Sequence, residues 1–284
     1  MSKIYDVLEK ATEVLKQKPL LRRVEGTAIV SGDLHGDYDA LKRLMRIRKL
    51  TKAKNLVLLG DFVDRGEKQL EVIYEIAKLV IEDKNFFPLR GNHEDEKICQ
   101  RYGFSDVVFA NSLDLDPFLD FFAQLPIAAV SNNSFMCHGG LPVKDFDISE
   151  VLKYPRLPTL LDGNRYEDIS NMLQLLWNDP IDGNPIDEKR AHLPSYRGVV
   201  GSYVFGNPVT RSFLEKNDLK FLLRAHQVFS KGAKWIQDDH ILSLFTSNSG
   251  PYAKQNINRK CAYLDLSDKS INKKDVKLLE IDRV

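Results

Sequence analysis

The sequence predicts an α/β protein in which parallel strands alternate with helices. Three short apolar runs, 27–30, 56–59 and 86–89, have the length of buried strands, and two segments with apolar residues at helical spacing separate them. This strand–helix–strand–helix–strand order is typical of a parallel sheet with crossover helices. A polar cluster follows each of the three strands, which predicts that the functional site lies at one edge of that sheet.

The other elements follow from the same patterns. Residues 2–17 carry apolar side chains at helical spacing, and Pro19 ends this helix. Seven of the twelve prolines fall between 141 and 210, which predicts a long, partly irregular segment that packs on the body of the protein. Further helices are predicted at 117–125 and 168–176, and further strands at 127–130, 134–137, 221–223, 233–236, 241–245, 262–266 and 276–281.

Length and charge exclude several classes of protein. We expect one domain over 1–284, with a helical extension at 1–25 and a core at 26–284. The net charge of +1 provides no general attraction to nucleic acid or to an anionic membrane, so neither is expected as a partner. Three cysteines, an odd number without a C-x-x-C pair, together with an N-terminus that lacks a long apolar run, favour a cytoplasmic location.

The three polar clusters, 32–36, 60–66 and 90–94, contain residues that bind metals. Right-handed crossovers would bring all three strand ends to the same edge of the sheet. Their oxygen and nitrogen donors suit Mn, Fe or Zn, and a carboxylate such as Asp61 can bridge two metals. Two more histidines follow predicted strands. The candidate ligands are Asp33, His35, Asp61, Asn92, His138 and His226.

Each of these clusters also has a simpler interpretation. A single Asp-Leu-His or His-Gly-Gly segment is more often a turn or a hydrogen-bonded histidine than a ligand, and most arginines are solvated surface charges. Five such segments, all at predicted strand ends, are not explained by ordinary turns. We therefore favour one shared metal site over five unrelated loops.

Taken together, these motifs resemble the phosphoprotein phosphatase family, the serine/threonine phosphatases that share a two-metal core with calcineurin. The resemblance spans about 26–247, and the extension at 64–66 separates it from related metallophosphoesterases and nucleases. It implies a calcineurin-like metallophosphoesterase fold: a central β-sandwich flanked by helices, with the di-metal site at the mouth of the βαβαβ core. The matching segments are 32–36, 60–66, 89–94, 138–140, 177–180, 197–206 and 224–227.

The resemblance also implies a role for each ligand. Two divalent metal ions are expected, with Mn the first choice in vitro and Fe or Zn also suitable. Asp33 and His35 would bind the first ion and Asp61 would bridge the two. Asn92, His138 and His226 would complete the coordination of the second ion.

The activity implied is hydrolysis of phosphoserine and phosphothreonine in proteins by in-line attack of a metal-bridging hydroxide. Phosphoproteins would then be the partners of this chain. His93 would protonate the leaving oxygen, and Asp64 would orient its imidazole. The phosphoryl oxygens would be bound by Arg65, Arg90 and Arg197, whose forked donors suit phosphate.

Two alternatives use the same residues. A dinucleoside polyphosphate hydrolase would apply the same metals to a pyrophosphate link, and a non-catalytic scaffold would bind phosphoproteins without hydrolysis. The complete ligand set and the presence of both Asp64 and His93 argue against the scaffold. The segment 244–252 departs from the eukaryotic pattern, because Gly250 stands where the family has a tyrosine. We therefore leave Tyr252 out of the predicted site and expect a prokaryotic, archaeal-like member.

Overall fold

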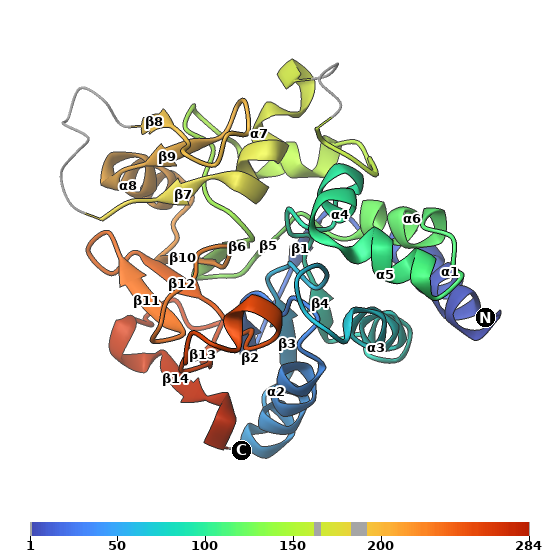
Figure 1. The fold of residues 1–284 in the computed structure, drawn as a ribbon. Helices are drawn as coiled ribbons and strands as arrows, with labels where there is room; N and C mark the ends of the chain where they lie inside the picture. Colours follow the sequence, from blue (N-terminus) through green and yellow to red (C-terminus); the bar gives the residue numbers. More distant parts are fainter. Residues whose placement is uncertain (1, 162–165, 183–191, 284) are drawn as a thin grey trace.

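Two β-sheets stacked face to face form the centre of the molecule (Figure 1). The computed structural model describes residues 2–161, 166–182 and 192–283. One sheet has the strand order β1 (Leu21–Arg23), β5 (Ala128–Val130), β6 (Ser134–Cys137), β10 (Phe221–Arg224), β12 (Ile241–Leu244) and β11 (Ala233–Ile236). The other has the order β14 (Lys277–Glu280), β13 (Lys260–Asp265), β2 (Thr27–Ser31), β3 (Asn55–Leu58) and β4 (Phe86–Pro88).

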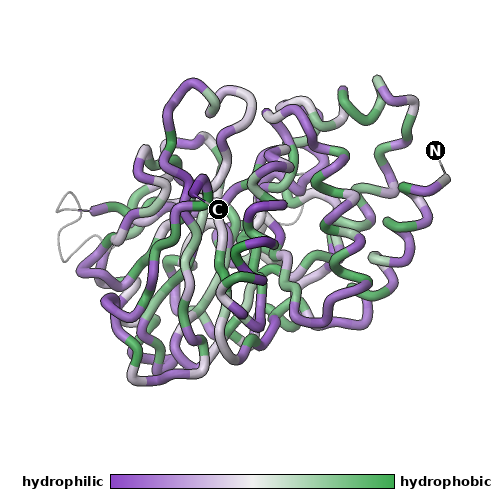
Figure 2. The backbone as a smooth tube through the Cα atoms, turned by 90° about the horizontal axis from the view of Figure 1, so that it is seen from below, coloured by the Kyte–Doolittle hydropathy of each residue, from purple (hydrophilic) through white to green (hydrophobic). Residues whose placement is uncertain are grey.

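The strands β2, β3 and β4 pair in parallel, as their apolar runs predict. Their inward side chains meet those of the other sheet in a dry layer that includes Val30, Val57, Met136 and Leu223, all fully buried. Both faces of these strands are covered, so their sequences are nearly continuous apolar runs. Figure 2 shows the hydrophobic stretches along the strands and the hydrophilic ones at the turns between them. The predicted sandwich is confirmed.

Helices cover the outer face of each sheet (Figure 1). The five-stranded sheet packs through Ile29 and Leu56 against one helical layer, and the six-stranded sheet packs through Phe135 and Leu222 against another. The first layer contains α1 (Ser2–Lys16), α2 (Tyr38–Thr51), α3 (Gln69–Glu82), α5 (Phe104–Ala110) and α6 (Asp116–Gln124). The second contains α7 (Tyr166–Trp177) and α8 (Asn207–Lys216), while α4 (Glu96–Tyr102) lies between β4 and α5 in the chain.

Two expectations need correction. The segment 1–25 is not only a helical extension, because β1 within it pairs in parallel with β5 and forms one edge of the six-stranded sheet. The proline-rich segment is less irregular than expected, because β7 (Asp179–Pro180), β9 (Tyr203–Phe205) and β8 (His192–Pro194) form a third, small sheet. Strands of two or three residues are too short to show a period in the sequence.

Short elements complete the described chain. They are the short 3₁₀ helices η1 (Ile148–Lys153), η2 (Gly250–Tyr252), η3 (Lys273–Asp275) and η4 (Ile281–Arg283). The thiols of Cys99, Cys137 and Cys261 are buried and unpaired with one another. Within the described ranges, every helix is too short or too polar to cross a membrane.

Candidate active site

The three polar clusters meet at one edge of the sandwich, as the crossover argument predicts. Asp33 and His35 follow β2, Asp61 follows β3 and Asn92 follows β4, while the other two histidines follow β6 and β10. All of them except the fully buried His138 line a pocket of about 350 Å³. It is lined by Asp33, His35, Asp61, Arg65, Asn92, His93, Tyr102, Trp177, Tyr196, Arg197, His226, Val228 and Tyr252.

The backbone is drawn tightly together around these side chains. A Cβ at Gly32 would lie 2.1 Å from the carbonyl oxygen of Leu244, and one at Gly91 would lie 2.2 Å from Oδ1 of Asp61. Only glycine fits at these two positions. Several residues of the site also adopt the left-handed conformation that side chains normally avoid, at a cost of about 1–2 kcal/mol each. They are His35, Asp61, Asp64, Arg65 and His226, with φ between 43° and 69°.

Backbone carbonyls fix the tautomers of two candidate ligands. Nδ1 of His35 donates to the carbonyl of Val63, and Nδ1 of His138 donates to the carbonyl of Leu59, both at 2.8 Å. The other nitrogen of each neutral ring therefore presents a lone pair. These Nε2 atoms lie 3.6 Å and 3.3 Å from Oδ2 of Asp61. The bridging carboxylate proposed from the sequence thus lies between the two imidazoles.

Electron-rich atoms converge on one side of this carboxylate. Nε2 of His138 is 2.9 Å from Oδ1 of Asn92 and 3.1 Å from Nδ1 of His226. In the neutral form of His138 the hydrogen is on Nδ1 and Nε2 has none to donate, so a cation is the group that relieves their mutual repulsion. On the other side, Nε2 of His35 lies 3.7 Å from Oδ2 of Asp33. These donors, all borderline nitrogen or hard oxygen, fit two divalent metal ions. Asp61 belongs to both of the described clusters that could hold an ion, which are His35–Asp61–His93 and Asp61–His138–His226.

Burial keeps most of these imidazoles in the neutral form that binds metals. It lowers the pKa of His35 to about 4 and lowers the pKa of His226 well below its usual value. Burial also raises the pKa of Asp33, with the neighbouring Asp61 adding to the effect. His138 is the exception, since the Asp61 carboxylate outweighs the burial penalty and raises the pKa of that imidazole. Buried carboxylates beside neutral imidazoles are suited to binding cations.

His93 and Asp64 form a separate pair beside the ligands. Nδ1 of His93 lies 2.6 Å from Oδ2 of Asp64, whose Oδ1 accepts the backbone N–H of Phe104 at 2.9 Å. Burial raises the pKa of Asp64 to about 7 and lowers the pKa of His93 to about 4, because it disfavours both charged forms. When both groups are neutral, the Asp64 carboxyl donates to Nδ1, and Nε2 then carries the N–H that faces the pocket. It lies 3.9 Å from Oδ2 of Asp61.

Two arginines reach the pocket from opposite parts of the chain. Arg65 donates from Nη1 to the hydroxyl of Tyr252 at 2.8 Å. Arg197 donates from Nε to Oδ2 of Asp179 at 2.5 Å and from Nη2 to the carbonyl of His226 at 3.2 Å. The other side of the Asp179 carboxylate binds the fully buried Arg224 at 2.8 Å. The sequence motif containing Asp179 therefore positions Arg197, which keeps Nη1 for other partners.

Arg90 is not in the pocket, and its assignment as a phosphate ligand is wrong. Its side chain is fully buried, and its guanidinium donates to three backbone carbonyls, those of Glu94 at 2.9 Å, Leu157 at 2.6 Å and Pro158 at 3.2 Å. All three nitrogens of the fork are thereby used. Arg90 fixes the chain at 157–158 against the loop that carries Asn92 and His93.

Sequence reasoning missed Tyr252. The short helix η2 brings its ring into a stack on His35, with centroids 5.4 Å apart and the planes inclined by 24°. The loop before it is rebuilt around Gly250, whose φ of 55° and close approach to the carbonyl of Arg65 require glycine. Alignment to a family position could not find this tyrosine, because it reaches the site from two residues further along the chain.

Glu94 also proves to be part of the framework. Its fully buried carboxylate accepts backbone N–H bonds from Asp61 at 2.9 Å, Phe62 at 2.7 Å and Gly91 at 2.8 Å. One side chain thus joins the loop after β3 to the loop after β4. Trp177 is buried but also lines the pocket, with its ring 5.7 Å from that of His226.

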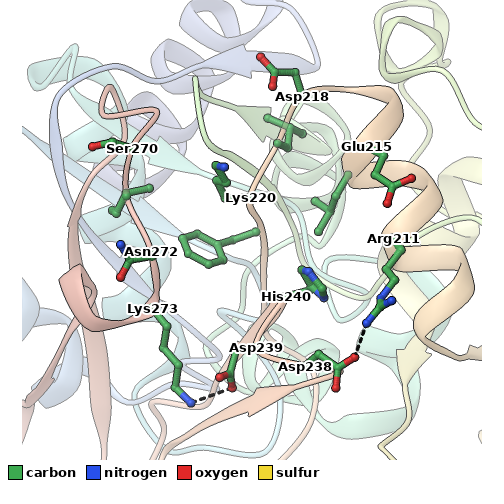
Figure 3. Close-up of a pocket in the computed structure, with 14 residues that line it drawn as sticks. Arg211, Glu215, Asp218, Lys220, Asp238, Asp239, His240, Ser270, Asn272 and Lys273 are labelled. Carbon is green, nitrogen blue, oxygen red and sulfur yellow. Dashed lines mark hydrogen bonds and ion pairs between the residues drawn. The ribbon is translucent and has the colours of Figure 1, made fainter.

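A larger cavity, of about 690 Å³, lies elsewhere, between α8 and the segment 270–273 (Figure 3). Its floor is apolar, and its charges are largely paired, as in the ion pairs Arg211–Asp238 and Lys273–Asp239. Both of the described clusters of His, Cys, Asp or Glu that could hold a metal lie in the smaller pocket instead. Chemistry, rather than size, identifies the candidate active site.

Comparison with known proteins gives the class of this protein. The family described as calcineurin-like phosphoesterase matches residues 27–229, and the chain belongs to that family. Its fold is similar to that of a protein serine/threonine phosphatase from Saccharomyces cerevisiae with similarity to human phosphatase PP5, with 23% identity, a TM-score of 0.81, and coverage of 98% of this chain and 88% of that one. It is also similar to a cold-active protein-tyrosine phosphatase of a psychrophile, Shewanella sp., with 14% identity, a TM-score of 0.62, and coverage of 89% and 79%. At these identities the two structures confirm the predicted fold.

Proposed function

We propose that this chain hydrolyses phosphoserine and phosphothreonine esters in proteins. One observation carries the proposal: a candidate acid, His93 with Nδ1 bound to Asp64, lines the same pocket as two arginines and a cluster of metal-binding side chains. Phosphomonoester hydrolysis needs these three components, namely an activated water, cations for the phosphoryl oxygens and a proton for the leaving group.

Two divalent cations at this centre would lower the pKa of a water molecule and neutralise charge on the phosphoryl group. They would be held by Asp33, His35, Asp61, Asn92, His138 and His226, whose lone pairs face one another in the structure. The positions of His35 and His138 are set by carbonyl bonds on their far nitrogens, so the ligands are oriented before any ion binds.

Arg65 and Arg197 bind the phosphoryl oxygens. Each is held by another side chain, Arg65 by the Tyr252 hydroxyl and Arg197 by the Asp179 carboxylate. A guanidinium fixed in this way loses little conformational entropy when it binds a phosphate. Forked donors also match phosphoryl oxygens better than a point charge does.

His93 donates the proton that the leaving serine or threonine oxygen requires. The Asp64 bond leaves Nε2 as the donor and fixes the ring, which also contacts Tyr102 with centroids 5.2 Å apart. The proton moves from Nε2 to the ester oxygen as the P–O bond breaks, and the Asp64 proton moves to Nδ1, so the imidazole stays neutral and Asp64 becomes a carboxylate. No covalent phosphoenzyme is required.

The similarity in fold to the yeast serine/threonine phosphatase over nearly the whole chain supports the choice of substrate. The protein-tyrosine phosphatase with a similar fold makes phosphotyrosine the nearest competing ester. Dinucleoside polyphosphates are the second alternative, since the same metals serve a pyrophosphate link.

The test is metal removal followed by add-back of Mn, Fe or Zn singly. Each sample is assayed with phosphoserine, phosphothreonine and phosphotyrosine peptides and with diadenosine tetraphosphate. We expect activity to return with metal and to be highest on phosphoserine and phosphothreonine. Full activity in the chelated protein would refute the metal-dependent mechanism, and faster cleavage of diadenosine tetraphosphate would refute the substrate class.

A further inference from the structure

Helix α4 ends at Tyr102 in the wall of the pocket, and the guanidinium groups of Arg65 and Arg101 lie over the ring of this tyrosine. The guanidinium carbon of Arg65 lies 4.8 Å from the ring centroid of Tyr102, and that of Arg101 lies 5.4 Å from the same centroid. Tyr102 lines the pocket and is 37% exposed. Since both distances refer to one ring, the two guanidinium carbons are at most about 10 Å apart.

Arg101 has no anionic partner of its own. Within the described ranges, neither it nor Arg65 forms an ion pair with a carboxylate, although the chain as a whole has nearly equal numbers of both charges. The only acidic residue of α4 is Glu96, and its carboxylate accepts a bond from Gln100 instead. Lys97, one turn before Arg101, adds a further exposed positive charge to the same face.

We infer that Arg101 is a specificity-determining residue that favours phosphopeptides with a second acidic group near the phosphorylated residue. This inference rests on the proposed function, since it concerns the peptide around the phosphoester. Arg65 binds the phosphoryl group in the pocket, and the neighbouring Arg101 binds the second anion at the rim. An extended peptide advances about 3.3 Å per residue, so a carboxylate two residues from the phosphoserine lies within reach of Arg101.

Tyr102 makes this arrangement possible. Its ring holds the Arg101 side chain by cation–π contact and so keeps the charge beside the pocket instead of free in solvent. The contact occupies a face of the guanidinium and leaves the N–H groups at its edge available for a carboxylate.

The test uses two phosphoserine peptides that differ only in having Glu or Gln at the positions two residues before and after the phosphoserine. For the wild-type protein with metal bound, kcat/KM on the Glu peptide should exceed that on the Gln peptide by about two- to fivefold, as expected for an exposed ion pair. In Arg101→Gln the ratio should fall to about one, and Arg101→Lys should restore part of it. Added salt should lower the wild-type ratio.

Arg46→Gln is the matched control, because it removes the same charge from an exposed position on α2, which contributes no residue to the pocket. It should keep the wild-type ratio. Equal kcat/KM values of the wild-type protein on the two peptides, or an unchanged ratio in Arg101→Gln, would refute the role of Arg101 and leave the proposed function unaffected. If the wild-type protein cleaved small phosphoesters but neither peptide, the proposed function would fail, and this inference with it.

Discussion

Replacing Arg90 should lower the stability of the protein rather than its affinity for phosphate. The family resemblance makes it a phosphate ligand, whereas the structure makes it a buried clamp that donates to the carbonyls of Glu94, Leu157 and Pro158. We consider Arg90→Met, which fills similar space without donors. It would leave the carbonyl of the fully buried Glu94 unsatisfied, at about 1–3 kcal/mol. It would also remove the bonds to Leu157, which is half-buried, and Pro158, which is exposed; the carbonyl of Pro158 still accepts the amide of Glu96.

Part of that loss is offset, because the substitution also removes a desolvated cation. Burial lowers the pKa of Arg90, which shows that its charged form is disfavoured there. We expect a net loss of about 2 kcal/mol in the free energy of unfolding, which corresponds to a decrease in Tm of about 4–8 °C. Urea unfolding followed by circular dichroism measures the first quantity, and thermal melting measures the second.

Arg65→Met is the matched control, because this arginine is exposed and lines the pocket. It should leave the free energy of unfolding within about 0.5 kcal/mol of wild type and raise KM for a phosphopeptide. Arg90→Met should show the reverse, lower stability with KM little changed below its Tm. If Arg90→Met instead had wild-type stability and a KM as high as that of Arg65→Met, the clamp assignment would be refuted. Arg90→Lys, which keeps the charge but cannot reach three carbonyls, should be intermediate in stability.

The other predictions concern the pocket itself. His93→Ala should keep its metals, measured by elemental analysis, and lose about 10²- to 10⁴-fold in kcat, the usual range for a positioned acid; unchanged turnover on an alkyl phosphate would remove it from that role. Asp61→Asn should lower the metal content below two ions per chain, since its carboxylate faces both groups of ligands; two retained ions would refute the bridging role. Tyr252→Phe keeps the stack on His35 but loses the bond to Arg65, so KM should rise about two- to tenfold with kcat less affected, given about 0.5–1.5 kcal/mol for one hydrogen bond.

Much of the fold follows from the sequence, because long periodic segments carry a strong signal. The strand 134–137 and the helix around Leu41 and Leu44 are observed where they were expected. Helices α4 and α5 and the small sheet were not predicted, because helices of seven residues are only about two turns long and the strands of the small sheet have two or three residues. The location of the metal ligands follows from topology, because parallel strands joined by right-handed crossovers bring their ends to one edge.

The direction of a side chain is harder to predict than its place in the chain. Arg90 and Asn92 lie two residues apart in one loop, yet only Asn92 lines the pocket. The carbonyls that hold Arg90 come from 157–158, a contact that no local pattern shows. Tyr252 was missed for a related reason, because the loop before it takes a path set by Gly250 and by its approach to Arg65.

The Glu94 carboxylate has a consequence for the motions of the protein. Amide groups of Asp61, Phe62 and Gly91 share this one acceptor, so none of them can open to solvent without disturbing the others. In native-state hydrogen exchange, the three amides should therefore lose their protection together, as one cooperative unit that spans two loops. The catalytic geometry would then be lost in one step as conditions become harsher, well before the sandwich beneath it melts.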